Sequence, residues 1–486
     1  MESTFIPLMV VFPLITAVIL NLLHGRVFVK HVILSLGFVL VLLPLFIAYG
    51  SHTFGAHTRE AYGTSIVPGI VYLFNTQKMI VILVLCLIAY LSVVSYLGAF
   101  KNPSGVYLSF MVLGVASCTA AVLTDDIFNF YVFLEIALIT QVALVIATGT
   151  LESIKASLKY LVVGNIAANM ILLGAALLLS SAGSLNVTDI ENHLKSMGPG
   201  IYSSPVLMLA CGLLVFGWAY ASGLYPFHNI KSELYGSAEP HAAGLIQTQT
   251  KFILVSFALI LLRLFRGVDS VRPVMLALSM GAMVFGVVMA LRQDDYKRLL
   301  SYHAVSQAGY VASGLSIGTP LGIVAGIFHA VNNALYKSAL FVGCECVKYR
   351  SRTTDFHRLG GALTAIPFVG VLVLGAKFAI SGIPPFNGFQ SKLLLLKSAL
   401  DVGLPEIAVV MILVSIATFV SMMKAFYMIY LRRNDVESID EGVPVTHVVA
   451  LFVLVALCVI LGVYPELAVQ YIRPLAEEVG LLWSVK

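Results

Sequence analysis

Three polar side chains lie four residues apart in an otherwise apolar stretch of this sequence. His329, Asn333 and Lys337 follow one another at that spacing, so they share one face if the stretch is helical. Imidazole and amine groups can take up and release protons, and amides or water molecules can bridge them. The row therefore predicts a proton relay whose members respond to each other's charge.

Other ionisable residues also stand in apolar surroundings. Lys251 follows a run of Gln and Thr residues, Lys392 follows the segment PPFNGF, and Glu135 lies within an apolar run. A charge at the centre of a bilayer costs roughly 2.5–3.5 kcal/mol on insertion scales, so a functional role is the default hypothesis. Five residues are predicted to carry protons or ions: Glu135, Lys251, His329, Lys337 and Lys392.

A second set of residues would extend this relay: His228, Lys231, His303, Asn333 and Lys377. The alternative for these is structural, and a hydrogen-bonded core histidine explains His303 equally well. Lys397 and Lys424 lie near the ends of apolar stretches, so their side chains are expected to reach the lipid headgroups. They are not assigned to the relay.

Membrane-spanning helices must position these residues. The 486 residues are 59% hydrophobic and 11% charged, with a mean hydropathy of +0.96, whereas a soluble domain is about 25% charged. A helix needs about 20 apolar residues to cross the hydrocarbon core. The sequence therefore predicts an all-α polytopic membrane protein with about 14 transmembrane helices, near 5–23, 30–50, 79–99, 106–124, 127–149, 156–181, 204–223, 242–265, 272–291, 300–317, 320–347, 364–400, 407–431 and 446–468.

The charges of the loops indicate an orientation. Loops after odd-numbered spans hold fifteen Lys and Arg, with Lys231 counted among them, and loops after even-numbered spans hold six. Cytoplasmic loops carry the excess of positive charge. Both termini are therefore expected outside.

An internal repeat divides the chain. Residues 222–234 read SGLYPFHNIKSEL and residues 381–393 read SGIPPFNGFQSKL, with six of thirteen positions identical. Proline removes an amide donor, so the helices are predicted to break at Pro226, Gly382, Pro384 and Pro385. Two broken helices of opposite direction are typical of inverted-repeat transporters. The expected divisions are helices 1–3 (1–105), a first repeat (106–266), a second repeat (267–431), and a last helix with its tail (432–486).

Several classes of function are excluded. No P-loop and no GxGxxG after a strand pattern occurs, and the six cysteines, all in apolar segments, lack the spacing of a zinc or iron–sulfur site. No basic stripe with interleaved aromatics predicts nucleic-acid binding. We expect no catalytic residue, no metal site and no cofactor in this chain.

Three long segments resemble those of a known family: KRLLSYHAVSQAGYVASGL (297–315), GIFHAVNNALYKSALF (326–341) and SGIPPFNGFQSKLLLL (381–396). SIKASLKYLVVGNIAANMILLG (153–174) and YPFH (225–228) add to them. The chain resembles the antiporter-like subunits of respiratory complex I (NADH-quinone oxidoreductase), membrane-bound energy-converting hydrogenases and Mrp cation/proton antiporters. This resemblance implies fourteen core helices with termini outside, inverted repeats in helices 4–8 and 9–13, breaks in helices 7 and 12, and one of the shorter members.

The same resemblance implies roles for particular residues. The family's glutamate on helix 5 matches Glu135, and its lysine on helix 8 matches Lys251. Its histidine and lysine on helix 11 match His329 and Lys337, and its charged residue after the second break matches Lys392.

One departure concerns the first repeat. The family usually has a lysine five residues before the proline of the PFH segment, paired with the glutamate of helix 5, and this sequence has Ala221 there. Lys231, Ser222 or His228 could compensate, although Lys231 is expected to face the cytoplasm. Whether the first half conducts ions stays open at this stage.

The expected function is an ion-translocating subunit, for protons or sodium ions, in a redox-driven complex of a prokaryotic plasma membrane. Other membrane subunits would be its partners and would hold any redox cofactors. Alternatives are an Mrp-type antiporter subunit without a redox partner, a stand-alone solute transporter with a specific substrate pocket, and a structural scaffold.

Overall fold

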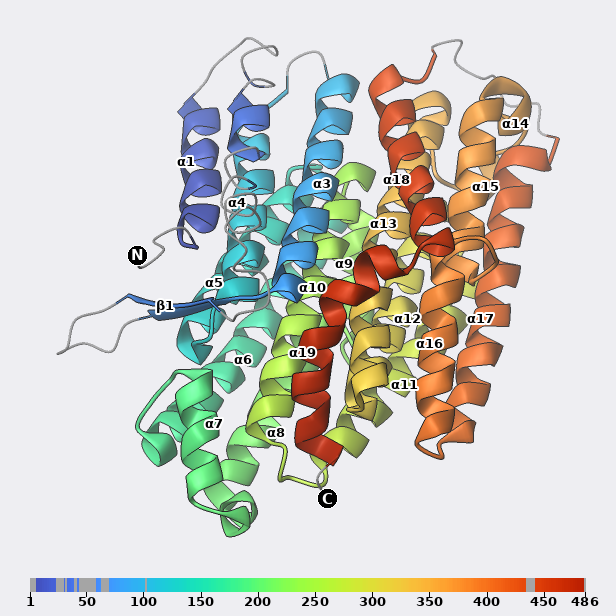
Figure 1. The fold of residues 1–486 in the computed structure, drawn as a ribbon. Helices are drawn as coiled ribbons and strands as arrows, with labels where there is room; N and C mark the ends of the chain where they lie inside the picture. Colours follow the sequence, from blue (N-terminus) through green and yellow to red (C-terminus); the bar gives the residue numbers. More distant parts are fainter. Residues whose placement is uncertain are drawn as a thin grey trace.

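Long helices running side by side form the body of the computed structural model (Figure 1). The structure describes residues 6–22, 30, 33–38, 42, 58–62, 70–100, 103–433 and 442–484. Within these ranges, nine helices are long and apolar enough to cross a membrane: α3 (Thr76–Ala99), α4 (Gly105–Leu123), α5 (Ile127–Ile146), α6 (Leu151–Ala182), α8 (Pro205–Ser222), α10 (Pro240–Leu264), α11 (Val271–Leu291), α17 with its π-helical end (Pro405–Leu431) and α18 (Val445–Val463).

Further helices complete the bundle. Two are short and apolar, α1 (Leu8–Leu22) and α15 (Pro367–Ser381). The others are richer in polar residues or shorter: α7 (Val187–Ser196), α9 (His228–Ser237), α12 (Tyr296–Ile317), α13 (Pro320–Ser351), α14 (Ala362–Ala365), α16 (Asn387–Asp401) and α19 (Glu466–Ser484).

The outer surface of the bundle is apolar. On α6, Val162 and Leu173 are 61% and 51% exposed, and on α17 Leu413 is 59% exposed. Apolar surface of this extent would not face water in a soluble monomer. The chain is therefore a multi-pass membrane protein with an apolar outer surface.

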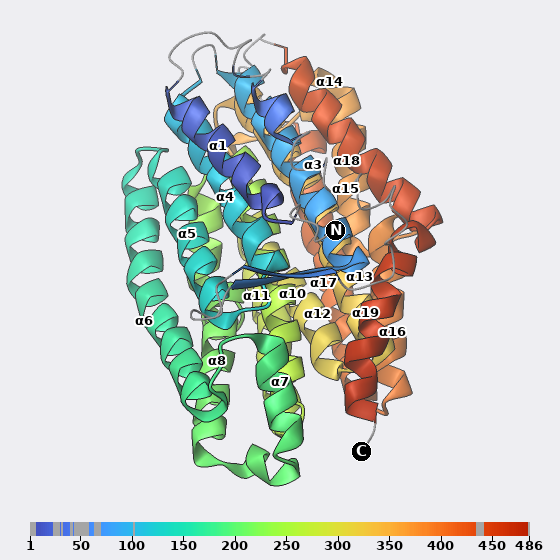
Figure 2. The ribbon, with the colours of Figure 1, turned by 60° about the vertical axis from the view of Figure 1, so that its left-hand side comes forward.

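The two central helices carry most of the buried polar residues. α10 and α13 pack against each other, with α4 to α8 on one side and α11, α12 and α15 to α17 on the other (Figures 1 and 2). Most residues of α10, from Pro240 to Leu264, are buried inside the protein. Polar side chains on these helices are thus shielded from lipid and must find partners within the protein.

Two interruptions occur at the repeated sequence. α8 ends at Ser222 and α9 begins at His228, while α15 ends at Ser381 and α16 begins at Asn387. Gly223 and Gly382 have φ of 67° and 81°, in the left-handed region that glycine adopts without a steric penalty. The prolines that follow cannot supply the amide donors of a continuing helix.

Some features differ from the sequence prediction. The fold is almost entirely helical, but it also contains an antiparallel hairpin of β1 (Thr58–Tyr62) and β2 (Ile70–Phe74). The predicted tail folds as α19, which packs against α13 and α3. Much of the predicted span at 30–50 lies outside the described residues.

Candidate functional site

Lys392 lies at the second interruption. Its ammonium group donates a hydrogen bond to the Ile380 carbonyl at 2.9 Å, and its side chain is 6% exposed. In a continuous helix this carbonyl would accept from the residue four positions on, which is Pro384 and has no N–H. The interruption therefore supplies the acceptor that holds Lys392 inside the protein.

A hydrogen-bonded network runs from this point along α13. His329 Nδ1 lies 2.9 Å from Ser391 Oγ, next to Lys392, and His329 Nε2 lies 3.1 Å from Gln307 Oε1. The Tyr336 hydroxyl donates to the same Gln307 oxygen at 3.0 Å, and Asn333 Nδ2 donates to the Tyr336 hydroxyl at 3.2 Å. The predicted row of polar groups is thus bridged by two side chains from outside it.

Lys337, Lys377 and His303 lie nearby, all fully buried. Lys337 donates to the Leu300 carbonyl, and Lys377 donates to the Met422 carbonyl at 3.3 Å. His303 Nε2 lies 2.9 Å from Ser421 Oγ. Lys337, Lys377 and Lys392 all act electrostatically on His303, so a charge that moves among the lysines is felt at this imidazole.

Lys251 occupies the middle of the bundle. It is 1% exposed on α10, beside Gln247, Thr248 and Gln249, which are fully buried. Its charge interacts with that of Lys337 and with that of Lys231. Lys251 is therefore close enough to a lysine of each sequence repeat for their charges to repel.

The predicted cytoplasmic position of Lys231 is wrong. Its side chain is 2% exposed, and its ammonium group donates to the Tyr160 hydroxyl at 2.6 Å and to Gln141 Oε1 at 3.4 Å. The interruption at Gly223 lets α9 turn its Lys231 face toward α5 and α6. Loop charge misplaced this residue because a lysine after a helix break is counted as a loop residue.

Glu135 is less buried than expected. It is only half-buried on α5, and no described residue forms a hydrogen bond or ion pair with it. It does act electrostatically on Tyr160 and Tyr220. Tyr160 is thus a common neighbour of Glu135 and Lys231, and Ala221, 6% exposed at the end of α8, contributes no charge.

His228 lies in an aromatic stack rather than in a hydrogen-bonded row. Its ring is 5.6 Å from that of Tyr225 and 5.7 Å from that of Phe285, both near parallel. Lys397 is exposed, as expected for a lysine near a helix end. Lys424 donates to the Leu291 and Gln293 carbonyls at 3.2 Å, at the end of α11.

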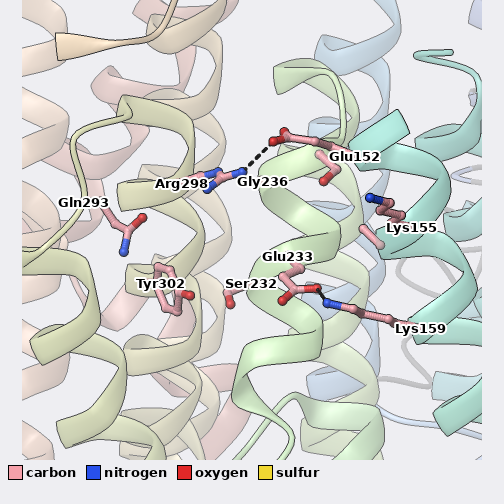
Figure 3. A pocket seen from close by; sticks show the side chains of 11 residues that line it. Glu152, Lys155, Lys159, Ser232, Glu233, Gly236, Gln293, Arg298 and Tyr302 are labelled. Atoms are coloured by element: carbon pink, nitrogen blue, oxygen red, sulfur yellow. Dashed lines mark hydrogen bonds and ion pairs between the residues drawn. The ribbon is translucent and has the colours of Figure 1, made fainter. Parts of the chain in front are cut away.

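A charged pocket of about 270 Å³ opens beside α9 (Figure 3). Glu233 pairs with Lys159 at 2.8 Å, and Arg298 pairs with Glu152 at 3.0 Å. Figure 3 shows α9, with Ser232 and Glu233, between Lys159 on one side and Tyr302 on the other. The pocket lies against the helix that carries Lys231.

Sequence reasoning missed six polar residues of these networks: Gln141, Tyr160, Gln307, Tyr336, Ser391 and Ser421. Gln307 lies four residues after His303, so the same helical spacing that selected His329 would have selected it. Tyr160 had no such signal, because its role depends on a contact between α6 and α9. Among the described residues, no group of three or more His, Cys, Asp or Glu is arranged to hold a metal ion, and all six cysteines are buried free thiols.

An apolar helical bundle with lysines and hydrogen-bonded histidines along its centre defines an antiporter-like membrane subunit. The family model described as NADH:quinone oxidoreductase/Mrp antiporter, TM, matches residues 124–421. The chain belongs to this family.

Curated relatives are similar in sequence to this protein over most of its length. An uncharacterized protein of Methanocaldococcus jannaschii is 49% identical over 99% of this chain and 100% of its own. A Na(+)/H(+) antiporter subunit of Alkalihalophilus pseudofirmus is 30% identical, over 75% of this chain and 74% of its own. An NADH-quinone oxidoreductase subunit of Desulforudis audaxviator is 30% identical, over 69% of this chain and 67% of its own.

Solved structures share the fold. A chain of the membrane-bound sulfane sulfur reductase, an archaeal respiratory membrane complex, superposes with a TM-score of 0.90 at 25% identity, covering 99% of both chains. A chain of the Mrp complex from Dietzia sp. superposes with a TM-score of 0.86 at 21% identity, covering 99% of this chain and 100% of that one.

Proposed function

We propose that this chain is the ion-translocating subunit of a redox-driven membrane complex and that protons, or sodium ions, move along its buried lysines. One observation carries the proposal: Lys231, Lys251, Lys337 and Lys392 all lie buried, in hydrogen-bonding surroundings, across both sequence repeats. Buried charges in a membrane protein are costly and mark ion paths. A purely structural bundle would have no need of them.

The first half uses Lys231 in place of a lysine at Ala221. Lys231 interacts electrostatically with Lys251 and shares Tyr160 with Glu135. The charged pocket beside α9 supplies water to this half. Glu135 would then exchange charge with Lys231 through Tyr160 and its neighbours.

The second half uses the network of His329, Gln307, Tyr336 and Asn333 between Lys392 and Lys337. Deprotonation of one lysine lowers the repulsion on the next, so charge can pass in steps without any redox chemistry in this chain. His303 and Lys377 adjust the electrostatic potential at the end of this path.

The topology that goes with this function has fourteen spans, with helices 7 and 12 broken into α8–α9 and α15–α16. The repeats 106–266 and 267–431 are inverted relative to each other, and both termini face outside. The membrane is a prokaryotic plasma membrane, and other membrane subunits hold any redox cofactors.

An antiporter without a redox partner is the second candidate, favoured by the similarity to the Na(+)/H(+) antiporter protein of Alkalihalophilus pseudofirmus. Affinity purification of the tagged chain from native membranes distinguishes the redox-driven complex from the antiporter. Partners with iron–sulfur or nickel centres support the redox-driven complex, and only small membrane subunits support the antiporter.

The translocation itself is tested in vesicles that contain the complete complex. Lys251→Ala and Lys337→Ala should each lower ion translocation by about a hundredfold, the lower end of what a positioned proton carrier contributes. Lys397→Ala, which removes an exposed lysine, should leave it unchanged. Full translocation in both core variants would exclude the proposed function.

A further inference from the structure

A second buried group of titratable side chains lies at one end of the central helices. Glu345 on α13 is 6% exposed, and His241 on α10 and His447 on α18 are 1% and 0% exposed. Glu345 Oε1 lies 2.7 Å from His241 Nδ1 and 3.7 Å from His447 Nε2. A carboxyl group is thus held between two imidazoles inside a membrane protein.

The group is not fully hydrogen-bonded. Glu345 Oε2 and His447 Nε2 are buried and have no hydrogen-bond partner among the described residues. Leaving such atoms unsatisfied is costly, so each of them can take one further hydrogen bond or proton. A proton fits this site best, because two ring nitrogens and one carboxylate do not form the all-oxygen shell that a hard cation prefers.

A pocket at the protein surface lies beside this group. It has a volume of about 420 Å³, and it is lined by Tyr107, Thr148, Glu239 and His241, among others. His241 Nε2 lies 3.1 Å from the Tyr107 hydroxyl on the pocket wall, and its Nδ1 contacts Glu345. The imidazole therefore stands between the pocket and the buried carboxyl group. It can accept a proton at Nε2, on the pocket side, and release one from Nδ1 to Glu345.

Glu345 also continues the row on α13. His329, Asn333, Lys337, Phe341 and Glu345 follow at intervals of four residues, so each is the neighbour of the next on the helix surface, in a row that turns by about 40° around the axis at each step. Phe341 is fully buried, and its ring centroid is 5.8 Å from the Lys337 ammonium. The side chain of Phe341 thus separates the Glu345 carboxyl group from Lys337, which lies about 12 Å away along the helix axis.

We propose that Glu345 and His241 together form a buried proton-loading site, filled from the pocket, and that Phe341 separates it from the relay that begins at Lys337. This inference rests on the proposed function and identifies the translocated ion as a proton. Other charged groups face the site from its neighbours: Glu239 and Lys348 pair at 2.6 Å, and Lys297 donates to the Ala238 carbonyl at 2.9 Å. Acidic and basic side chains thus both lie near the loading site.

Proton translocation in vesicles with the complete complex, in sodium-free buffer, tests the loading site. Glu345→Gln keeps the shape but cannot ionise, and it should lower the rate by about tenfold or more. Glu406→Gln, at the exposed start of α17, is the matched control and should leave the rate unchanged. A Glu345→Gln rate equal to that of the unmodified complex would overturn the inference.

Phe341 gives a test in the opposite direction. Phe341→His completes the polar row and should raise the passive proton leak of the vesicles, whereas Phe341→Leu keeps the position apolar and should not. An unchanged leak in a folded Phe341→His variant contradicts the role of Phe341 as the separating residue.

Infrared difference spectroscopy of the purified full chain, recorded between acidic and alkaline pH, gives a readout independent of transport. The carbonyl band of protonated carboxylic acids should lose intensity in Glu345→Gln relative to the unmodified chain. A band of unchanged intensity contradicts titration of Glu345. If Lys392→Ala blocks translocation and Glu345→Gln does not, only this inference fails; if neither blocks it, the proposed function fails as well.

Discussion

Gly223 and Lys231 lie in such close contact that a Cβ atom on the glycine would be 2.5 Å from Lys231 Cγ. The second repeat contains the same relationship, since a Cβ on Gly382 would be 2.9 Å from Lys392 Cδ. The ungapped sequence repeat pairs Lys231 with Gln390 and not with Lys392. Both interruptions therefore place a lysine of the following half-helix over a left-handed glycine, at different positions of the repeat.

Removal of Lys392 should interrupt the second half. Lys392→Ala leaves the Ile380 carbonyl without the donor at 2.9 Å, and ion translocation should fall by about a hundredfold. Translocation in vesicles with the complete complex measures this. Lys397→Ala on the same helix is the control, and equal losses in the two variants would indicate a general defect of α16.

Lys231 should be required for ion translocation in the first half, and a lysine at position 221 should be able to replace it. Lys231→Ala should lower translocation by about tenfold or more. The double variant Ala221→Lys/Lys231→Ala should restore much of the activity, because Ala221 lies at the end of α8 beside the same interruption. Lys397→Ala, which removes an exposed lysine outside this half, should have little effect. A fully active Lys231→Ala complex would show that Lys231 is only structural.

The second interruption should not tolerate a side chain at Gly388. A Cβ at this position would overlap the Ala379 carbonyl oxygen, and a backbone atom cannot move away as a flexible side chain can. Gly388→Ala should therefore lower the free energy of unfolding by about 1–3 kcal/mol, seen as a lower Tm in detergent. Gly212→Ala has open space around it and should keep or raise the Tm.

Arg263 should be important for stability rather than transport. Its guanidinium group contacts Asp125 Oδ1 at 3.0 Å and Glu191 Oε2 at 2.9 Å, which ties α10 to α7 and to the turn before α5. Arg263→Ala leaves the buried Asp125 without its cation and leaves Glu191 with only the exposed Lys195, at 2.6 Å, at a cost of about 3–5 kcal/mol. The Tm of thermal unfolding measures this loss of stability. Arg266→Ala is the control and should leave the Tm nearly unchanged. An unchanged Tm would mean that water satisfies both carboxylates.

The sequence by itself determined the class of this protein. An apolar composition requires a bilayer, and the helical spacing of His329, Asn333 and Lys337 placed them on one face of α13. Gly and Pro determine where a helix can continue, so the positions of the interruptions followed from SGLYPF and SGIPPF. These inferences depend on local covalent geometry and on hydrophobicity, which the sequence specifies directly.

Only the tertiary structure decided which buried groups meet. Lys231 looked like a loop residue until the packing of α9 against α5 and α6 placed it on Tyr160 and Gln141. Glu345 and His241 are 104 residues apart, and no local pattern links them. Contacts of this kind depend on how the helices pack, and packing is set by the sum of many weak interactions that no single motif records.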